Sequence, residues 1–544
     1  MSLSFPTLAA IRFGYGLRPG EAPPADAEAL LAQAAAPKRA DLPFTALPLA
    51  RRRQLFLAMR ARNRAVAAHA KPLPPEERVP LIKAQGRDVQ LMLLAERQDR
   101  LSNAVLSPHG FHERLAAFWV DHFSTNIGKS GDLRQLVPMQ ERDAIRPHLT
   151  GRFADLLSAA VRHPAMLLYL DQQASFGPNS PVGKKQKRGL NENLARELIE
   201  LHTMGAGSGY SQTDVTSAAR VLTGLVPNAQ RTDWAFLRQR AEPGAHPVLG
   251  TTYGGSLRSE RDVEHLLADL AARPQTAAHL CRKLAAHFIA DQPPAALVSA
   301  MTQAWRRSDG DLMAVYRVLV THKDGQDVTL GKIKPPFDYV ASSLRALDID
   351  QATLDAPRPS ARKAAPERAA MLAAETEEAA KQSGAAGRQT MSAMQDGADA
   401  KEPGGDAMMT NGAAALIRTL GKPGDRLDAL LDERLETLAA RRKSLSRDAV
   451  QTIAALGQPI WQPPSPAGWP DTESAWIGGG ALTGRIAWAR RLGASFGGDE
   501  DPTALLKDAL GEAARDDTIR TVSRAPRRQV GLTLALASPE FNRR

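Results

Sequence analysis

Apolar residues recur at helical spacing wherever the sequence is regular. The segment 152–161 places one apolar stripe along a helix, formed by Phe153, Leu156, Leu157, Ala160 and Val161. The same periodicity recurs in segments 259–272, 274–290, 311–322 and 529–541. Strand signals are few, and the glycine- and proline-rich stretch 241–257 predicts a small hairpin or an irregular loop. The pattern predicts an all-α fold, a large and irregular multi-helix domain.

Residues 351–412 interrupt this pattern. They contain almost no large apolar side chains other than methionine, so they bury too little surface to offset the entropy of ordering. We predict a mostly disordered insertion here, with one fraying helix near 364–383. The insertion separates a main helical part, 1–350, from a helical C-terminal part, 413–544, that packs on the same domain.

Composition agrees with a folded helical protein and restricts its partners little. The 544 residues are 43% hydrophobic, enough for a sizeable core, and the 5% aromatic content favours helix over sheet. A net charge of +11 is small for this length, so it permits an acidic partner without requiring one. Nucleic-acid binding through a basic surface is therefore our weakest alternative. The single cysteine, Cys281, excludes an internal disulfide framework.

The sequence shows no signal peptide and no membrane span. Its first residues, MSLSFPTLAAIRFGYG, lack a basic n-region, and Pro6 and Arg12 interrupt their short apolar run. No stretch reaches the roughly 18 uninterrupted apolar residues that a membrane-spanning helix needs. These signals predict a cytoplasmic protein.

The segment 191–205, NENLARELIELHTMG, carries a dense group of polar side chains. Asn191 is placed to cap a helix, and Gly205 is placed to end it. The apolar residues Leu194, Leu198 and Leu201 fall on one face and are predicted to be core. His202, near the end of this helix, is predicted to be a C-terminal cap rather than a metal ligand.

Two rows of polar residues cover the rest of this helix. Glu192, Arg196 and Glu200 have i, i+4, i+8 spacing, which predicts a ladder of ion pairs. Asn193 and Glu197 form a second row beside it. Spacing alone favours the simpler interpretation, a solvated helix face. In the alternative, Arg196 holds the carboxylates of a partly buried centre for proton transfer or metal binding.

Histidine chemistry is confined to the first part of the chain, because all twelve histidines precede residue 323. His122 stands in an aromatic stretch with Trp119, which favours a structural histidine in the core. If a metal is bound, the ligands we predict are His122 with Glu197, Glu200 or His202, because metal ligands in helical bundles come from different helices. The signal is weak, so no metal or cofactor is assigned.

A further helix is predicted between Ser211 and Gly224, because Ser211 and Asp214 form an S-x-x-D capping box. Tyr210 and Arg220 have no evident capping or packing role. The candidate binding residues are Asn191, Glu192, Asn193, Tyr210, Asp214, Arg220 and Trp119. The tryptophan-rich segment 461–488 can be interpreted as a stacking surface for sugar rings or bases, but packing onto the helices is favoured. P-loop, C-x-x-C and G-x-S-x-G motifs are missing, so enzymatic activity is left open.

Several motifs occur in a fixed order that resembles a bacterial family. They read FADLL, HPAMLLYLD, GLNENLARELIELHTMG and GYSQTDVTSAARVLTG, with RFGYGLRPGE and RLAAFWVDHFST upstream. Downstream stand HPVLGTTYGG, KLAAHFIADQPP, LGQPIWQPPSPAGWP and SPEFNRR. On these residues the chain resembles the bacterial family called domain of unknown function 1800, over nearly its whole length except 351–412.

The resemblance implies a place in the cell more than a reaction, because the family has no settled activity. Its members look like envelope or periplasmic proteins, often encoded beside a Tat-exported partner that resembles the alkaline phosphatase and sulfatase superfamily. The resemblance therefore implies an accessory or binding protein that acts with such an envelope partner and reaches the periplasm by export with it. The alternative is a metal- or carboxylate-dependent hydrolase with a Glu/Arg/His centre, whose small-molecule ligand is unknown.

Overall fold

The computed structural model describes residues 3–35, 48–255, 257–327, 329–356, 426–498 and 500–544. The helices before the first strand are α1 (Phe5–Leu8), α2 (Ala27–Ala34), α3 (Leu49–Ala70), α4 (Pro75–Leu106), α5 (Gly110–His122), α6 (Leu133–Gln140), α7 (Phe153–Arg162), α8 (Pro164–Tyr169), α9 (Pro181–Gln186), α10 (Asn193–Glu200) and α11 (Gln212–Leu222). The later helices are α12 (Glu260–Ala272), α13 (Pro274–Phe288), α14 (Ala295–Arg307), α15 (Leu312–Thr321), α16 (Pro336–Ala346), α17 (Gln351–Asp355), α20 (Arg426–Ala440), α21 (Leu445–Ala455), α22 (Gly479–Phe496), α23 (Pro502–Leu510), α24 (Asp516–Ser523) and α25 (Arg528–Ala537).

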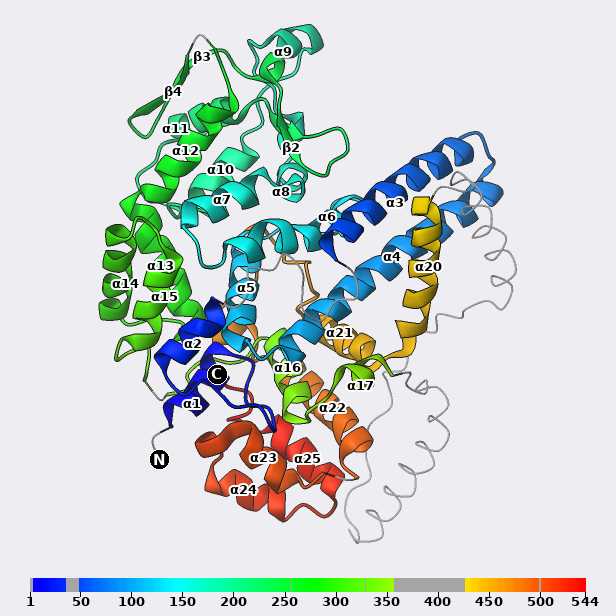
Figure 1. The fold of residues 1–544 in the computed structure, drawn as a ribbon, viewed down its shortest axis with the longest axis vertical. Helices are drawn as coiled ribbons and strands as arrows, with labels where there is room; N and C mark the ends of the chain where they lie inside the picture. The colour runs from blue at the N-terminus through cyan, green and yellow to red at the C-terminus, as the bar shows by residue number, and fades with distance from the viewer. Residues whose placement is uncertain (1–2, 36–47, 256, 328, 357–425, 499) are drawn as a thin grey trace, which may run out of the picture.

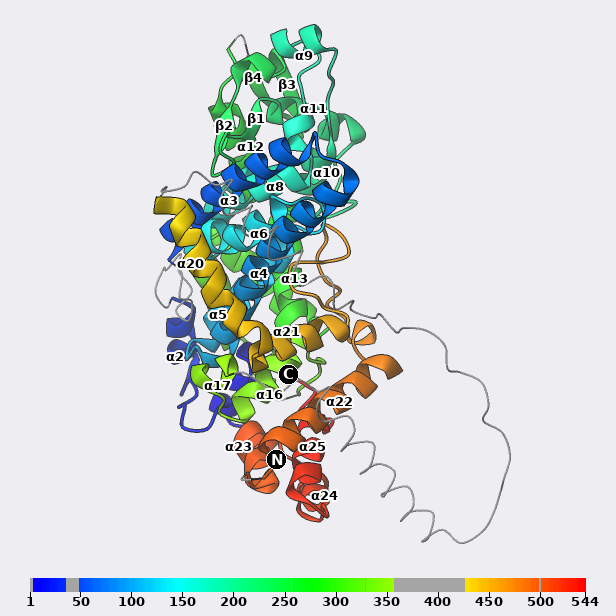
Figure 2. The same ribbon diagram turned by 90° about the vertical axis from the view of Figure 1, so that its right-hand side faces the viewer.

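These helices form an elongated body with a layer of long helices on one side. Figure 1 shows α9 at one end of the body and α23, α24 and α25 at the other. Figures 1 and 2 both show α20 beside α3 and α4, and these three helices pack together. No helix among the described residues is long and apolar enough to cross a membrane.

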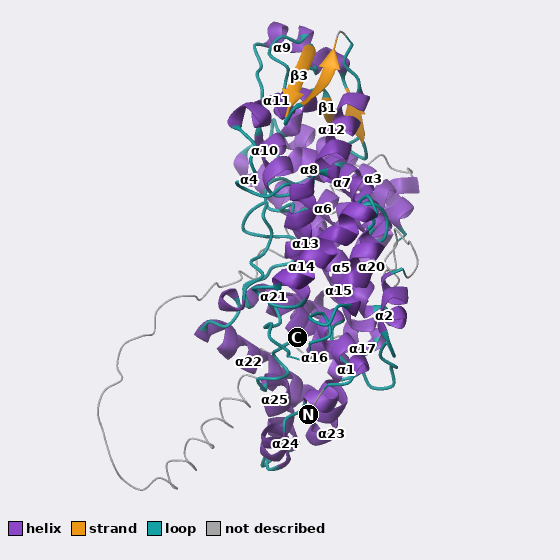
Figure 3. Ribbon diagram, turned by 90° about the vertical axis from the view of Figure 1, so that its left-hand side faces the viewer, coloured by secondary structure: helices purple, strands orange, loops and turns teal. Residues whose placement is uncertain are grey.

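Strands in the described part of the chain form two small antiparallel sheets. In one sheet β1 (Leu225–Pro227) pairs with β2 (Trp234–Phe236). In the other, β3 (Gly244–Val248) pairs with β4 (Thr251–Gly255), which confirms the hairpin predicted within 241–257. Figure 3 shows that the strands lie near one end of a body that is otherwise helical. The predicted all-α fold is confirmed.

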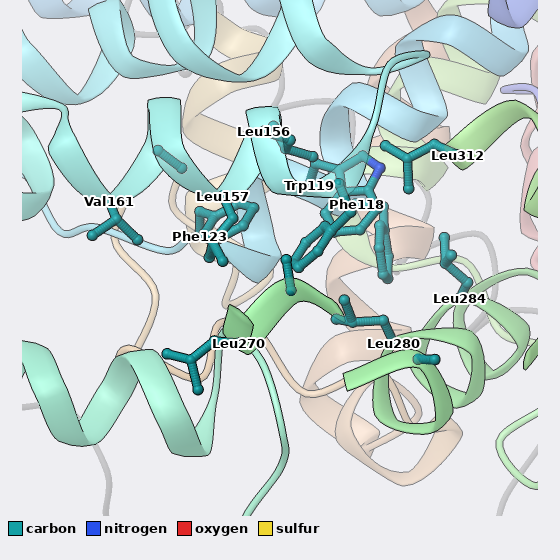
Figure 4. Packing of buried hydrophobic residues seen from close by; sticks show 14 of the residues in the cluster. Phe118, Trp119, Phe123, Leu156, Leu157, Val161, Leu270, Leu280, Leu284 and Leu312 are labelled. Atoms are coloured by element: carbon teal, nitrogen blue, oxygen red, sulfur yellow. The ribbon is translucent and has the colours of Figure 1, made fainter. Parts of the chain in front are cut away.

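One apolar core lies where α5, α7, α12 and α13 meet. The stripe predicted for 152–161 falls in this core, and its five residues are fully buried. Figure 4 shows Leu156 and Leu157 of α7 beside Trp119 and Phe123 at α5. The helical spacing of the stripe places all five side chains on the face of α7 that packs against its neighbours.

A second core combines residues from both sides of segment 357–425. It contains Tyr339 and Leu344 of α16, Ile453 of α21 and Trp488 of α22, all fully buried. The helices that follow the segment therefore share apolar packing with helices that precede it. The proposed division of the chain at 350 and 413 stays a prediction.

The first residues of the predicted insertion, from 351, are helical. Residues Gln351–Asp355 form α17, because Asp350 Oδ1 accepts the Thr353 N–H at 2.8 Å and Leu354 is buried. The remainder of the predicted insertion, including the fraying helix near 364–383, lies outside the described residues.

Candidate functional site

The polar helix of the sequence motif is shorter than predicted. Asn191 Oδ1 accepts the Asn193 N–H at 3.0 Å, as expected near a helix start, although Glu192 occupies the N-cap position. The prediction that the helix runs to Gly205 is wrong, because α10 ends at Glu200 and residues 201–204 form a turn that leads to Gly205 in the left-handed region, φ +90°. Leu201, in this turn, is half-buried rather than core.

The predicted ion-pair ladder forms on the outer face of α10. Arg196 lies 3.2 Å from Glu192 and 3.4 Å from Glu200, and its side chain is 38% exposed. Such exposed pairs contribute about 0.2–0.5 kcal/mol each. Glu197 is half-buried, and burial followed by the Glu200 carboxylate raises its pKa. This geometry favours the solvated-face interpretation, and catalytic roles for these residues stay a prediction.

The candidate binding residues near α11 complete local hydrogen bonds. The predicted capping box forms, since the Ser211 N–H donates to Asp214 at 2.8 Å and the Asp214 N–H donates to Ser211 Oγ at 3.2 Å. Asp214 also accepts the Leu249 N–H at 2.7 Å, which ties the β3–β4 turn to α11. The Arg220 carbonyl accepts the Thr223 hydroxyl at 2.6 Å.

Glu192 and Tyr210 connect α10 to α11. Glu192 accepts hydrogen bonds from Thr216 at 2.6 Å and from Gln212 at 2.8 Å. Burial, and then a hydrogen bond to Glu200, raises the pKa of Tyr210. These contacts hold two helices together on the surface, which is a structural role for most of the motif.

His122, His202 and Trp119 are buried in the core instead of lying on that surface. His122 Nε2 donates to the His202 carbonyl at 3.2 Å, and His202 Nδ1 donates to the His122 carbonyl at 3.1 Å. His202 is therefore not the helix cap that we predicted, because burial directs its ring to another segment. Lys283 Nζ lies 3.1 Å from His122 Nδ1, and Trp119 Nε1 donates to Tyr316 Oη at 2.7 Å.

Burial keeps both rings neutral. It lowers the pKa of His202 to about 3 and that of His122 well below its ordinary value, and the Lys283 ammonium adds to both shifts. Among the residues that the structure describes, no three His, Cys, Asp or Glu side chains are grouped as a metal ion requires. None of the predicted combinations of His122 with Glu197, Glu200 or His202 is part of such a group there.

A cavity elsewhere in the molecule gathers a different set of polar groups. It lies between α5, α6, α16 and the segment that joins α21 to α22, and about 880 Å³ of space, including the part open to solvent, separates its walls. Helix α5 contributes Arg114, Ala117 and Asp121, whose i, i+3, i+7 spacing places them on one face. The aromatic part of the wall consists of Phe123, Phe337, Trp461, Trp469 and Trp476.

Five charged or polar side chains form a closed ring at this cavity. Asp338 accepts hydrogen bonds from Arg114 and from Arg544, the latter at 2.6 Å. Arg114 Nη2 donates to His287 Nε2 at 3.0 Å, and His287 Nδ1 donates to Asp471 at 3.0 Å. Arg544 closes the ring with a 3.3 Å contact to Asp471. Because His287 is neutral in the ring, the positive charges of two guanidinium groups and the negative charges of two carboxylates cancel.

Asp121 stands in the same cavity wall but outside the ring. Its Oδ1 accepts the Trp469 N–H at 2.9 Å. The loop approaches Asp121 so closely that a Cβ on Gly468, whose φ is +89°, would lie 2.7 Å from the Asp121 carbonyl oxygen. Glycine is therefore required at this position on both steric and conformational grounds.

Two of the carboxyl groups that line the cavity, those of Asp121 and Asp471, have pKa values displaced in opposite directions. Burial raises the pKa of Asp121 to about 7, and the neighbouring Asp471 carboxylate adds to this shift. Burial alone would also raise the pKa of Asp471, but His287 and Lys332 more than offset it, and the pKa of Asp471 lies below its ordinary value. Burial lowers the pKa of His287, consistent with its neutral form in the ring.

Asp121, His287 and Asp471 were not predicted from the sequence, although each lies in or directly beside a quoted motif. Asp121 precedes His122 in RLAAFWVDHFST, and its seven-residue separation from Arg114 was a usable signal for a shared helix face. His287 lies in KLAAHFIADQPP, and Asp471 directly follows LGQPIWQPPSPAGWP. Trp461 and Trp476 are buried, as the packing interpretation of that segment predicted, yet they also line the cavity.

Comparison with known protein families gives one result that covers nearly the whole chain. The family model described as Protein of unknown function (DUF1800) matches residues 8–543. No curated protein and no solved structure matches the chain. The matched range includes every residue of the cavity wall described above, as well as the α10–α11 motif. The chain belongs to the DUF1800 family of proteins of unknown function.

Proposed function

We propose that the protein is a carboxylate-dependent hydrolase whose acid–base pair is Asp121 and Asp471. The observation that supports this most is that both carboxyl groups line one cavity while their pKa values are displaced in opposite directions. A carboxyl group that keeps its proton near neutral pH can donate it to a leaving group. An ionised carboxylate beside it can accept a proton from water or attack as a nucleophile.

The surrounding residues position this pair. Because Arg114 donates to His287 Nε2, the ring proton of His287 is on Nδ1 and is directed at Asp471. His287 is then a positioning residue and not the base. The Trp469 N–H holds one oxygen of Asp121, which fixes the carboxyl group in the wall. The proposal retains the hydrolase alternative from the sequence but moves its centre away from Glu197, Glu200 and Arg196.

Asp121→Asn is expected to reduce hydrolysis about 10²–10⁴-fold, because the amide has no proton to transfer as an acid. In the unchanged protein, the rate should rise as Asp471 ionises in the acid range and fall as Asp121 loses its proton around pH 7. The measurement is release of p-nitrophenol from p-nitrophenyl esters, phosphates and glycosides across acidic to mildly alkaline pH.

Asp348→Asn is the matched control, since Asp348 lies outside the cavity and its side chain is 55% exposed. This variant should keep the full rate and the same pH profile. Full activity of Asp121→Asn, or no cleavage of any of the three substrate classes by the unchanged protein, would contradict the proposed function.

A place in the envelope, acting with an exported phosphatase- or sulfatase-like partner, is a second proposal and rests on the family resemblance alone. This proposal is compatible with hydrolase activity, because the partner would supply only the export route and not the reaction. We expect the protein in the periplasmic fraction when such a partner is produced in the same cells. Retention in the cytoplasmic fraction despite an exported partner would remove this proposal.

A further inference from the structure

We propose that the cavity beside Asp121 binds a carbohydrate through Trp461, Glu141 and Trp469. This inference deepens the proposed function, because it names the substrate class of the same cavity. It stands on three observations: polar atoms of the wall that lack hydrogen-bond partners, an aromatic surface beside them, and cations that are already neutralised.

The first observation is a donor and an acceptor in the cavity wall that make no hydrogen bond, although the acceptor is ion-paired. Trp461 is buried, and its indole Nε1 makes no hydrogen bond. Glu141 Oε2 is also buried and accepts no hydrogen bond, although Arg100 lies 3.3 Å away. Buried polar atoms without partners are rare, because each costs about 1–3 kcal/mol. A hydroxyl group both accepts and donates, so a polyhydroxylated molecule can satisfy both atoms once the side chains move to expose them, because each atom is fully buried.

The backbone at Trp461 supports a binding role. Its φ of +59° lies in the left-handed region, which costs a residue with a side chain about 1–3 kcal/mol. The Ile127 N–H holds the strained carbonyl at 3.1 Å. Strain of this kind is concentrated at ligand-binding positions, where it directs a side chain that ordinary backbone geometry would not.

The second observation is the surface that Trp469 presents. Its ring is partly exposed in the cavity and lies 6.1 Å from the Trp476 ring, at an angle of 52°. The Trp476 indole already donates to the Pro470 carbonyl at 3.0 Å, so Trp476 supports the loop. Trp469 therefore offers an apolar face to the C–H side of a sugar ring, in the same cavity that Trp461 and Glu141 line.

The third observation argues against an anionic ligand. The guanidinium groups that line the cavity are Arg100 and Arg114, and each already faces a carboxylate, of Glu141 and Asp338 respectively. A phosphate or carboxylate ligand would have to displace these partners, at a cost in unpaired buried charge. A neutral, hydroxylated ligand leaves the ion pairs intact.

The test measures binding without turnover, using full-length Asp121→Asn protein. Saturation-transfer NMR is recorded with millimolar maltotetraose, cellotetraose and chitotetraose, and with adenosine as a non-carbohydrate that also stacks on indole rings. We expect transfer to the ring protons of at least one tetrasaccharide. In this background, Trp461→Phe, which removes the N–H and keeps an aromatic ring, should weaken the affinity about 10-fold. Trp469→Ala should weaken it by a similar factor.

Trp234→Phe is the matched control, because Trp234 lies on β2 outside this cavity, and it should leave the affinity unchanged. Circular dichroism confirms that each variant is folded. Transfer to none of the sugars, transfer to adenosine alone, or sugar binding that both cavity variants leave unchanged would overturn the inference. Sugar binding without any hydrolysis by the unchanged protein would reject the proposed hydrolase and keep the sugar site. Hydrolysis without sugar binding would reject the sugar site and keep the proposed hydrolase.

Discussion

Asp338→Ala is expected to lower the free energy of unfolding by about 3–5 kcal/mol. The Asp338 carboxylate accepts from Arg114 and Arg544, and the side chains of both arginines are only 1% exposed. Removing it leaves two guanidinium groups in a buried place without their shared partner. The loss follows from the uncompensated charge more than from the contact itself, since burying an intact ion pair gives little net stability.

The measurement is urea denaturation followed by circular dichroism. Asp348→Ala is the control, because that carboxylate makes one 2.7 Å pair with Arg18 and is 55% exposed, so its removal should cost about 1 kcal/mol or less. Asp338→Asn keeps the side-chain volume, and its amide oxygen still accepts a hydrogen bond. Its loss of unfolding free energy should therefore lie between those of Asp338→Ala and Asp348→Ala. Equal stabilities of Asp338→Ala and Asp348→Ala would show that the buried ring contributes no more than a surface pair.

Mild acid is expected to destabilise the protein, with the loss beginning near pH 6.5. His122 and His202 are neutral in the fold because burial lowers their pKa values, that of His202 to about 3. In the unfolded chain they take up protons below their ordinary value of about 6.5. The unfolded state therefore binds more protons between pH 6.5 and the folded pKa values, and stability falls as the pH falls through that window.

Each histidine contributes up to about 1.4 kcal/mol per pH unit within this window. Asp121 acts in the opposite direction, because its pKa of about 7 lets the folded state take up a proton that the unfolded state takes up only in stronger acid. Asp121 thus offsets about one of the two histidines, and the net dependence of stability on pH from these three groups should equal that of about one histidine. The melting temperatures at pH 6.5 and at pH 5 measure this dependence together with that of other histidines, such as His279, whose pKa burial lowers to about 4.

His202→Asn isolates one contribution. The Asn amide can replace the donor that His202 Nδ1 supplies to the His122 carbonyl, but it takes up no proton. The stability of the His202→Asn variant should depend less on pH in this window. His69 is exposed on α3, so the His69→Asn variant should show the pH dependence of the unchanged protein. An unchanged slope in His202→Asn would show that the buried histidine does not cause the acid sensitivity.

The sequence predicted the parts of this fold that depend on local periodicity. The buried stripe of α7, the hairpin of β3 and β4, and the capping box of Ser211 and Asp214 follow from spacings of a few residues. The length of α10 was overestimated, because burial of His202 beside His122 turns the chain before Gly205. That tertiary contact is invisible to a pattern of apolar and polar positions.

The cavity could not be predicted in the same way. Its ring combines Arg114, His287, Asp338, Asp471 and Arg544, which are distributed over most of the chain. No local spacing relates such positions, and the densest polar motif proved to be a surface ladder. Asp121 lines the cavity and Glu197 does not, and this difference depends on the packing of distant segments and not on the sequence around either residue.

The same ring has a consequence for synthesis on the ribosome. Asp338 and Arg544 are separated by 206 positions. At about 5–20 residues per second, roughly 10–40 s pass between the appearance of Asp338 and that of the last arginine. During this interval the carboxylate can pair with Arg114 alone, and Asp471 does not yet exist for part of it. A nascent chain should therefore hold the first core well before it has a working cavity, and slowing the translation of residues 339–544 should lengthen the life of that intermediate.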